Sequence, residues 1–387
     1  MQFLDNLNPS LESSYSLLAK KIKNKKNYIS LGLGEPNFVT PIKIINSACE
    51  AMRNGFTRYS SPFGMEDLRK LISKKLNREN RIDASPDEVL VTAGGKMALG
   101  LALSVILEPH DEIIVIDPSY PSYKNQIIIA QPKAKIRIFN LTKDNFSIDL
   151  DKINLLFNDK TKAIILNYPH SPTGEILSQS KLKELVKFLY KKNSWIISDE
   201  VYEKLCFGSK KHYSFGSFKK IAKKTITINS FSKAFSMTGW RIGYLHADRK
   251  IIKKISQIQQ HTLNNVPTFI QKAAITALNK CHKDIYKFNL LLNKNSNYLS
   301  KSIKNLKSLS LIKKSEGGLF SFISIKNVKK IKSEEFSMLF LKKFKVFTTP
   351  GIFFGKEWDD HIRVSLSCDE VLFKKAVDRL VQFANNL

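Results

Sequence analysis

One lysine in this chain is spaced among residue types that bind phosphate. Lys233 follows Ser230 and Ser232 closely, and Arg241 stands eight residues after it. Lysine amines form covalent adducts with carbonyl compounds, whereas hydroxyls and a guanidinium donate hydrogen bonds to a phosphate ester. The spacing therefore predicts a site for a cofactor that carries both an aldehyde and a phosphate.

The surroundings of Lys233 favour a functional position over a solvated surface lysine. The preceding run Thr225–Asn229 alternates like a buried strand, and Ile242–His246 is a second strand-like run. A lysine at the end of a core strand points to chemistry, because burying its charge without a purpose is costly. We therefore expect Lys233 to face a binding site.

The whole run from Ser230 to Tyr244, S-F-S-K-A-F-S-M-T-G-W-R-I-G-Y, resembles the lysine segment of the class I pyridoxal-phosphate aminotransferases, in their aspartate aminotransferase-like branch. The resemblance implies that Lys233 binds pyridoxal 5'-phosphate as a Schiff base, and that Ser230, Ser232 and Arg241 bind its phosphate. It also implies that the freed lysine moves a proton from the substrate Cα. The resemblance runs from about residue 30 to the C-terminus.

Short β-rich runs alternate with stretches of helical period, which predicts crossover units and a mainly parallel sheet. Besides the runs that flank Lys233, the expected strands are Glu88–Thr92, Glu112–Ile116, Lys162–Leu166 and Trp195–Ser198. The expected helices are 96–107, 178–192, 250–261, 333–344 and 369–383.

The length of 387 residues makes two domains the default expectation. The resemblance implies fold type I of the pyridoxal-phosphate-dependent transferases, an α/β fold with a three-layer, mainly parallel-sheet large domain and a smaller α+β domain. It assigns residues 1–45 to an N-terminal arm and part of the small domain, 46–285 to the large cofactor-binding domain, and 286–387 to the small C-terminal domain.

Ligands of open parallel sheets bind at the carboxyl ends of the strands, so the residues after each strand are candidates for ligand binding. Gly95 and Lys96 follow the first strand, where glycine allows close backbone approach and a helix start offers amides to a phosphate.

Asp199 and Tyr202, in Ser198-Asp199-Glu200-Val201-Tyr202, resemble the family pattern S-D-E-x-Y. The resemblance implies that Asp199 pairs with the protonated pyridine nitrogen and that Tyr202 binds the ring's phenolic oxygen. A helix N-cap is the alternative for Asp199.

The segment from Asn167 to Gly174, N-Y-P-H-S-P-T-G, resembles the family turn N-x-P-x-N-P-T-G with one departure. Ser171 replaces the asparagine that contacts the cofactor, which puts the tuning of the cofactor in question. For His170, a structural or solvent-facing role is expected rather than catalysis. Tyr120 aligns with the aromatic residue that stacks on the ring. Tyr59 matches the tyrosine that reaches the phosphate in a neighbouring subunit, which implies a homodimer with shared active sites.

The resemblance also identifies the substrate-binding residues. Arg363 matches the arginine that binds the α-carboxylate, a group that amino acids and 2-oxo acids share and that a guanidinium grips through two hydrogen bonds. Gly34 matches the small residue over that carboxylate. The expected donor is aspartate or a related amino acid, and the expected acceptor is 2-oxoglutarate. Lys96 could attract a second carboxylate, whereas Glu12 of the N-terminal arm would repel it.

Two other functions stay open. A β-elimination lyase of the same fold, acting on sulfur amino acids, is disfavoured by Met237–Trp240, which has the aminotransferase-like form. The net charge of +29 suggests a nucleic-acid-binding protein. However, only 10 of the 63 basic residues are arginines, and the lysines are spread along the chain. Since direct recognition of bases and phosphates favours arginine, no specific nucleic-acid partner is expected.

Cysteine spacing and hydropathy argue against a metal-binding, disulfide-rich, membrane or secreted protein. The four cysteines are scattered, so neither a zinc site nor a disulfide framework is expected, and no metal is assigned. No apolar run reaches transmembrane length, so no membrane partner is expected. The residues Met1–Asn6 lack the order of a signal peptide. A cytoplasmic enzyme is the expectation.

Overall fold

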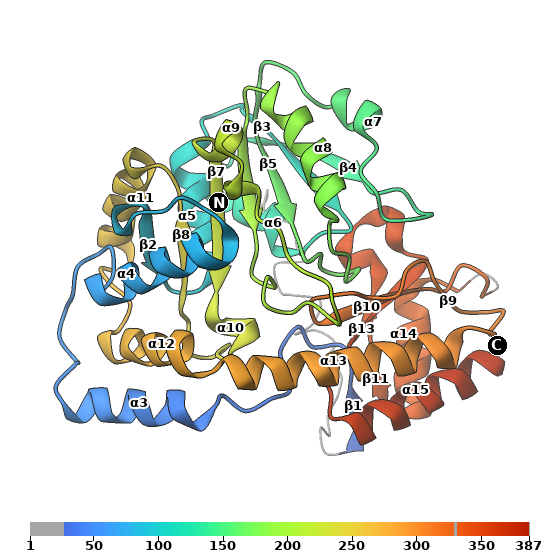
Figure 1. Ribbon diagram of the computed structural model, residues 1–387. Helices are drawn as coiled ribbons and strands as arrows, with labels where there is room; N and C mark the ends of the chain where they lie inside the picture. Colours follow the sequence, from blue (N-terminus) through green and yellow to red (C-terminus); the bar gives the residue numbers. More distant parts are fainter. Residues whose placement is uncertain (1–26, 329–330, 387) are drawn as a thin grey trace.

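A seven-stranded sheet organises most of the chain (Figure 1). The computed structural model describes residues 27–328 and 331–386, so Glu12 lies outside the described residues. The strand order is β2-β8-β7-β6-β5-β3-β4. Their bounds are Val89–Thr92 for β2, Glu112–Asp117 for β3, Lys135–Asn140 for β4, Thr161–Asn167 for β5, Trp195–Asp199 for β6, Thr225–Ser230 for β7 and Gly243–His246 for β8.

The direction of the strands places their carboxyl ends at one edge. The strands from β7 across to β4 are parallel, whereas β8 is antiparallel to both β7 and β2. Two reversals restore the direction, so β2 ends at the same edge as β7. The predicted mainly parallel sheet is confirmed, and the loops after β2, β3, β5, β6 and β7 all reach this edge.

Burial explains why the central strands could be predicted and one edge strand could not. Strands β3 and β7 are buried along their whole length, and each buried Ile, Leu or Val contributes roughly 1.5–3 kcal/mol. Strand β4, the sequence KIRIFN, was not predicted; it is the half-exposed outer strand. Strand β2 begins at Val89, one residue later than predicted, because Pro86–Glu88 forms a 3-10 turn.

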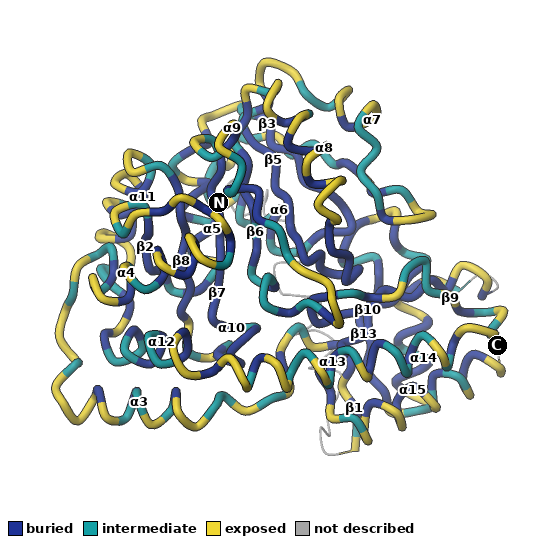
Figure 2. The backbone as a smooth tube through the Cα atoms, viewed as in Figure 1, coloured by how far each residue is buried: buried dark blue, intermediate teal, exposed yellow. Residues whose placement is uncertain are grey.

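Helices cover both faces of the sheet, which gives the predicted three layers. The helices α5 (Gly95–Ile106), α6 (Ser122–Ala130) and α11 (Arg249–Thr262) pack on one face. The opposite face is covered by α4 (Glu66–Lys75), α8 (Gln179–Tyr190), α9 (Lys219–Ala222) and α12 (Thr268–Lys280), and α3 (Ile42–Arg53) packs along α12. Figure 2 shows this arrangement as buried strands beneath helices with exposed outer faces.

Side-chain caps fix the starts of three predicted helices. Ser178 accepts a hydrogen bond from the Lys181 amide at the start of α8, and Asp248 accepts one from the Lys250 amide at the start of α11. Asp369 caps α15 (Glu370–Asn385) in the same way. Such caps satisfy amides that the helix itself leaves unpaired, so the helices begin within one residue of the predicted positions.

A second sheet lies beside the first and has the order β12-β13-β10-β9. Its antiparallel strands are β9 (Ser310–Leu311), β10 (Phe320–Ser324), β12 (Thr349–Pro350) and β13 (His361–Ser365). The helices α13 (His282–Ile303), α14 (Ser333–Phe344) and α15 share its hydrophobic core. This is the smaller α+β part of fold type I, and the predicted domain boundaries themselves stay predictions.

One short strand pair joins the start of the described chain to its C-terminal part. Strand β1 (Ile29–Ser30) pairs with β11 (Val346–Phe347) in parallel. Beyond it, the Ser365 amide donates to the Leu31 carbonyl at 2.6 Å. These bonds carry the segment that follows Leu31 to the second sheet and over the loops of the first.

None of the helices in the described ranges combines the length and apolar character needed to cross a bilayer.

Candidate active site

A cavity of about 630 Å³ lies between the carboxyl edge of the large sheet and the second sheet. Its volume suits a ligand of cofactor size. Twelve of the thirteen predicted site residues line it: Gly34, Gly95, Lys96, Tyr120, Ser171, Asp199, Tyr202, Ser230, Ser232, Lys233, Arg241 and Arg363. Tyr59 does not line it; its side chain is 86% exposed. The prediction that Tyr59 completes a neighbouring subunit's site stays a prediction.

Lys233 enters the cavity from α10 (Phe231–Ala234), one helical turn that follows β7 directly. Its Nζ donates to the Gly34 carbonyl oxygen at 2.6 Å. Burial lowers the pKa of Lys233 to about 8, and the charge of Arg241 acts in the same direction, against the opposing charge of Glu35. Burial therefore makes the free amine, the form that attacks a carbonyl, easier to reach near neutral pH than in an ordinary lysine.

Hydroxyls, a helix start and a guanidinium surround one end of the cavity. Ser230 Oγ bonds Ser232 Oγ at 2.9 Å and accepts from the Ser232 amide at 3.1 Å. No side chain of the described residues caps the first turn of α5, so its amides remain directed at this end. Arg241 folds over it, with Nη1 bonded to the Thr238 carbonyl at 2.8 Å. Together these donors form an anion site of the kind that phosphate occupies.

Gly94 is required where the helix start meets the arginine. Its φ of +85° lies in the left-handed region, and a Cβ there would stand 2.7 Å from Arg241 Nη2. A side chain would therefore push the guanidinium away from the anion site.

Asp199 is the last residue of β6, and it lines the cavity next to Tyr123. The Tyr123 hydroxyl donates to Asp199 Oδ2 at 2.6 Å, and the Val201 amide donates to Oδ1 at 3.2 Å. Burial raises the pKa of Asp199 to about 6, and these two hydrogen bonds oppose that rise. Asp199 is thus ionised at neutral pH and can pair with a cationic ring nitrogen. Tyr123 was not predicted from the sequence.

Tyr202 and Ser171 lie together beside the same cavity. Burial raises the pKa of Tyr202, so its hydroxyl keeps its proton and can donate. Ser171 Oγ is near enough to lower that pKa slightly, but it is buried and makes no hydrogen bond of normal geometry among the described residues. The Ser171 amide donates to Asn167 Oδ1 at 2.9 Å, which fixes the turn. Ser171 therefore has a hydroxyl to offer a ligand.

His170 belongs to the packing of this turn and does not line the cavity. Its Nδ1 lies 2.8 Å from Thr173 Oγ1, and its ring is 4% exposed. Burial lowers the pKa of His170 to about 3, so the ring is neutral in the folded protein. This geometry matches the structural role expected from the sequence.

Arg363 comes from β13 in the middle of the second sheet and is buried. Its Nη2 donates to the Gly32 carbonyl at 2.9 Å, and its guanidinium carbon lies 3.9 Å from the centre of the Phe320 ring. Burial lowers the pKa of Arg363 to about 9, which leaves it cationic at neutral pH. A Cβ added to Gly34 would lie 3.8 Å from Nη2, so this glycine borders the guanidinium.

Lys96 and Tyr120 form another wall of the cavity. The Lys96 ammonium lies 5.8 Å from the centre of the Tyr120 ring, a cation–π distance. Tyr120 meets Tyr123 edge-to-face, with ring centres 5.5 Å apart. Tyr120 is thereby held in place as a flat surface, and Lys96 is exposed and free to reorient.

Glu35 lines the cavity and was not predicted from the sequence. The Thr238 hydroxyl donates to its carboxylate, and its charge raises the pKa of Lys233 against the effect of burial. The neighbouring Ser236 hydroxyl donates to the Phe38 carbonyl. These bonds fasten the segment after Gly34 to the loop between Lys233 and Arg241. Its position next to Gly34 in the sequence was the available signal.

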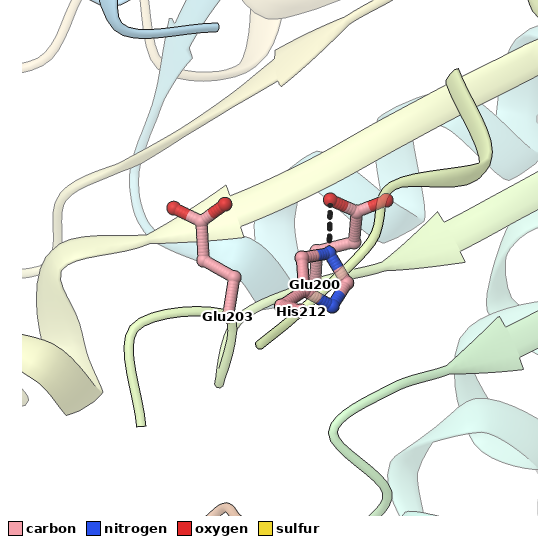
Figure 3. A group of neighbouring side chains, drawn as sticks. All are labelled: Glu200, Glu203 and His212. Atoms are coloured by element: carbon pink, nitrogen blue, oxygen red, sulfur yellow. Dashed lines mark hydrogen bonds and ion pairs between the residues drawn. The ribbon is translucent and has the colours of Figure 1, made fainter. Parts of the chain in front are cut away.

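Within residues 27–328 and 331–386, one group of side chains has the spacing of metal ligands: Glu200, Glu203 and His212 (Figure 3). Its atoms are already engaged. His212 Nε2 lies 2.8 Å from Glu200 Oε2, and the Ser214 hydroxyl donates to Glu200 Oε1 at 2.6 Å. The Lys75 ammonium pairs with Glu203. Burial opposes ionisation of Glu203, but the charge of Lys75 and its neighbours outweighs this and lowers its pKa to about 2. The group is a hydrogen-bonded ionic network, and we assign no metal to it.

The cavity fits a compound with an aldehyde, an aromatic ring and a phosphate. Lys233 supplies an amine at its base, and the start of α5 with Ser230 and Arg241 supplies an anion site. Asp199 offers a carboxylate for a cationic ring nitrogen, and the buried Ser171 hydroxyl offers a donor for a ring oxygen. Pyridoxal phosphate carries all these groups, so the residues present suit it.

Comparisons with known proteins agree with this geometry. The model of the family described as "Aminotransferase class I and II" matches residues 26–380. The aspartate aminotransferase of Pyrococcus abyssi is 34% identical over 381 residues, covering 97% of this chain and 96% of that protein. Aromatic-amino-acid aminotransferase 2 of Thermococcus litoralis is 32% identical, with coverage of 97% and 96%. The solved aspartate aminotransferase of Thermotoga maritima superposes with a TM-score of 0.91 at 31% identity, covering 100% of both chains.

Proposed function

The chain belongs to the class I and II aminotransferases, in their aspartate aminotransferase-like branch, and is an aminotransferase; from this premise we propose that it transfers the amino group of aspartate or a related L-amino acid to 2-oxoglutarate. The relatives carry aminotransferase names, so neither a β-elimination lyase nor a nucleic-acid-binding protein is favoured.

The observation that carries the proposal is the meeting of Lys233 and Arg363 at Gly34. Lys233 Nζ donates to the Gly34 carbonyl oxygen at 2.6 Å, and Arg363 Nη2 would lie 3.8 Å from a Cβ added to the same residue. An α-amino acid has its amine and carboxylate on one carbon. A lysine and an arginine that both border Gly34 can therefore serve the two groups of one substrate.

The family uses pyridoxal phosphate, which supplies, when bound, an aldehyde that takes up the amine and a ring that withdraws electrons from the adjacent carbon. Lys233 would hold the aldehyde carbon and, once displaced, move the proton from the substrate Cα. Its pKa of about 8 allows it to accept and return a proton near neutral pH. Asp199 would keep the ring nitrogen cationic, and Tyr202 would donate to the ring oxygen.

The substrate side chain would lie among Lys96, Leu33 and Phe320. Lys96 supplies positive charge for a distal carboxylate, and the two apolar residues offer contact to a larger side chain. This mixture supports an acidic donor and leaves room for an aromatic one, which the names of the relatives include. A panel of amino donors with 2-oxoglutarate tests the proposal directly. Failure of every α-amino acid donor would refute it.

Lys96→Met is expected to lower kcat/KM for aspartate about tenfold or more while sparing aromatic donors. The variant removes a charged contact to the distal carboxylate, worth roughly 1.5–3 kcal/mol when shielded from water, and keeps the apolar stem. Because Lys96 is exposed, the lower end is expected. Steady-state kinetics with aspartate and phenylalanine measure the ratio. An equal loss for both donors would contradict this role.

Ser171→Asn is expected to shift the visible pH titration of the bound cofactor to lower pH. The longer amide would add a donor to the ring oxygen and favour its ionised form, which makes the neighbouring cofactor nitrogen easier to deprotonate. Spectra recorded across the titration measure the midpoint, and transamination should persist. A midpoint that stays or rises would mean that Tyr202 or water already satisfies the oxygen.

We further propose that the active enzyme is a homodimer in which Tyr59 serves the partner's phosphate site. Its exposed side chain, outside its own cavity, supports this arrangement.

A further inference from the structure

We propose that Tyr123 is a positioning residue whose phenol holds the Asp199 carboxylate ionised and directed into the cavity. The inference rests on the proposed function, because the partner of Asp199 would be the ring nitrogen of pyridoxal phosphate. It assigns Tyr123 a task that Tyr120, its neighbour in the same turn, does not share.

The geometry fixes the direction of the hydrogen bond. The Tyr123 hydroxyl lies 2.6 Å from Asp199 Oδ2, a short distance typical of a bond between a hydroxyl and a carboxylate. Burial, together with the charge of Asp199, raises the pKa of Tyr123 well above its usual value. Tyr123 therefore keeps its proton and acts as the donor.

Both partners are held rigidly by their own surroundings. Tyr123 lies in the first turn of α6, is 3% exposed, and packs in the core between α5 and the sheet. The Lys124 ammonium bonds Asp117 Oδ2 at 2.8 Å, which ties this turn to the end of β3. The Asp199 carbonyl accepts from Asn167 Nδ2 at 2.9 Å. With both backbones fixed, the bond sets the orientation of the carboxylate.

The hydrogen bond from Tyr123 affects whether Asp199 is ionised, because several charges act on this carboxylate. The ionisable groups that face it are Tyr123 from α6, Glu200 and Tyr202 from the turn after β6, and Lys233 from α10. Burial raises the pKa of Asp199 to about 6; Glu200 raises it further, and the Tyr123 bond and Lys233 lower it. Loss of the Tyr123 bond would move that pKa toward neutrality. A protonated Asp199 cannot pair with a cationic nitrogen.

Tyr123→Phe tests the inference because it removes the hydroxyl and keeps the packed ring. We expect cofactor-free Tyr123→Phe protein to bind pyridoxal phosphate roughly ten- to hundredfold more weakly than the wild type, the loss of one hydrogen bond to a charged group. The loss should grow as the pH falls from about 9 to 6, because Asp199 of the variant, with its pKa raised toward neutrality, takes up its proton in this range before the wild type does. Equilibrium dialysis at several pH values measures both effects.

Tyr298→Phe is the matched control. Tyr298 also donates to a carboxylate, that of Asp378 at 2.5 Å, but on the surface between α13 and α15. Its removal should leave cofactor affinity unchanged at every pH. In an Asp199→Asn background, Tyr123→Phe should add little, because two residues that act through one bond are not additive.

Three results would overturn the inference: unchanged affinity in Tyr123→Phe, a loss of equal size at every pH, or a full loss that persists in the Asp199→Asn background. The second and third would mark Tyr123 as a packing residue only. Failure of the wild type itself to bind pyridoxal phosphate would instead overturn the proposed function.

Discussion

Lys233→Ala is expected to abolish transamination and the covalent attachment of pyridoxal phosphate. The amine of the half-buried Lys233 lies in the cavity with its pKa lowered to about 8, and it is the group placed to hold the aldehyde and to move the Cα proton. Loss of a general base alone costs typically 10²–10⁴-fold in rate, and loss of the covalent role adds to this. Borohydride reduction followed by peptide mass analysis measures the attachment.

The wild-type reaction should also depend on pH in a defined direction. Because the neutral amine is the reactive form, attachment of the cofactor to cofactor-free protein should accelerate as the pH rises through about 8. Lys253→Ala, which removes an exposed lysine of α11, is the control and should leave the borohydride-trapped adduct intact. A trapped adduct that persists in Lys233→Ala would assign the attachment to another lysine.

Arg363→Ala is expected to lower kcat/KM for every α-amino acid substrate alike, by roughly 1.5–3 kcal/mol or about 10- to 150-fold. The guanidinium is buried between Gly32 and Phe320, where water screens its charge little. A carboxylate bound there would gain two parallel hydrogen bonds. Kinetics with acidic and aromatic donors measure the loss, and cofactor affinity should not change because Arg363 serves the substrate.

Arg363→Lys separates charge from geometry at the same position. Lysine keeps the positive charge but lacks the planar fork, so it should recover only part of the lost kcat/KM. If Arg363→Ala turned over carboxylate substrates as fast as the wild type, the assignment would be wrong. A loss of cofactor affinity in Arg363→Ala would indicate damage to the cavity wall instead.

The sequence by itself determined the type of fold, and it was enough to predict a reactive role for Lys233. Ser230, Ser232, Lys233 and Arg241 lie within twelve residues, and one strand and one turn are enough to bring such a segment together. The central strands were predictable because they are buried and rich in Ile, Leu, Val and Thr, as in Glu112–Asp117 and Thr225–Ser230. Asp199 and Ser171 could be proposed for the same reason, since each follows a strand at the edge where ligands bind.

The tertiary structure alone decided which distant residues meet. The Gly34 carbonyl reaches Lys233 across 199 positions, and Arg363 reaches Gly32 across 331, because β1 pairs with β11 and carries this segment between the two sheets. Hydrophobic periodicity records which face of an element is buried, not which element covers it. The bond from Tyr123 to Asp199 likewise depends on the strand order, in which β5 lies between β3 and β6. No local pattern specifies that order, so the partner of Asp199 was decided only when the sheet assembled.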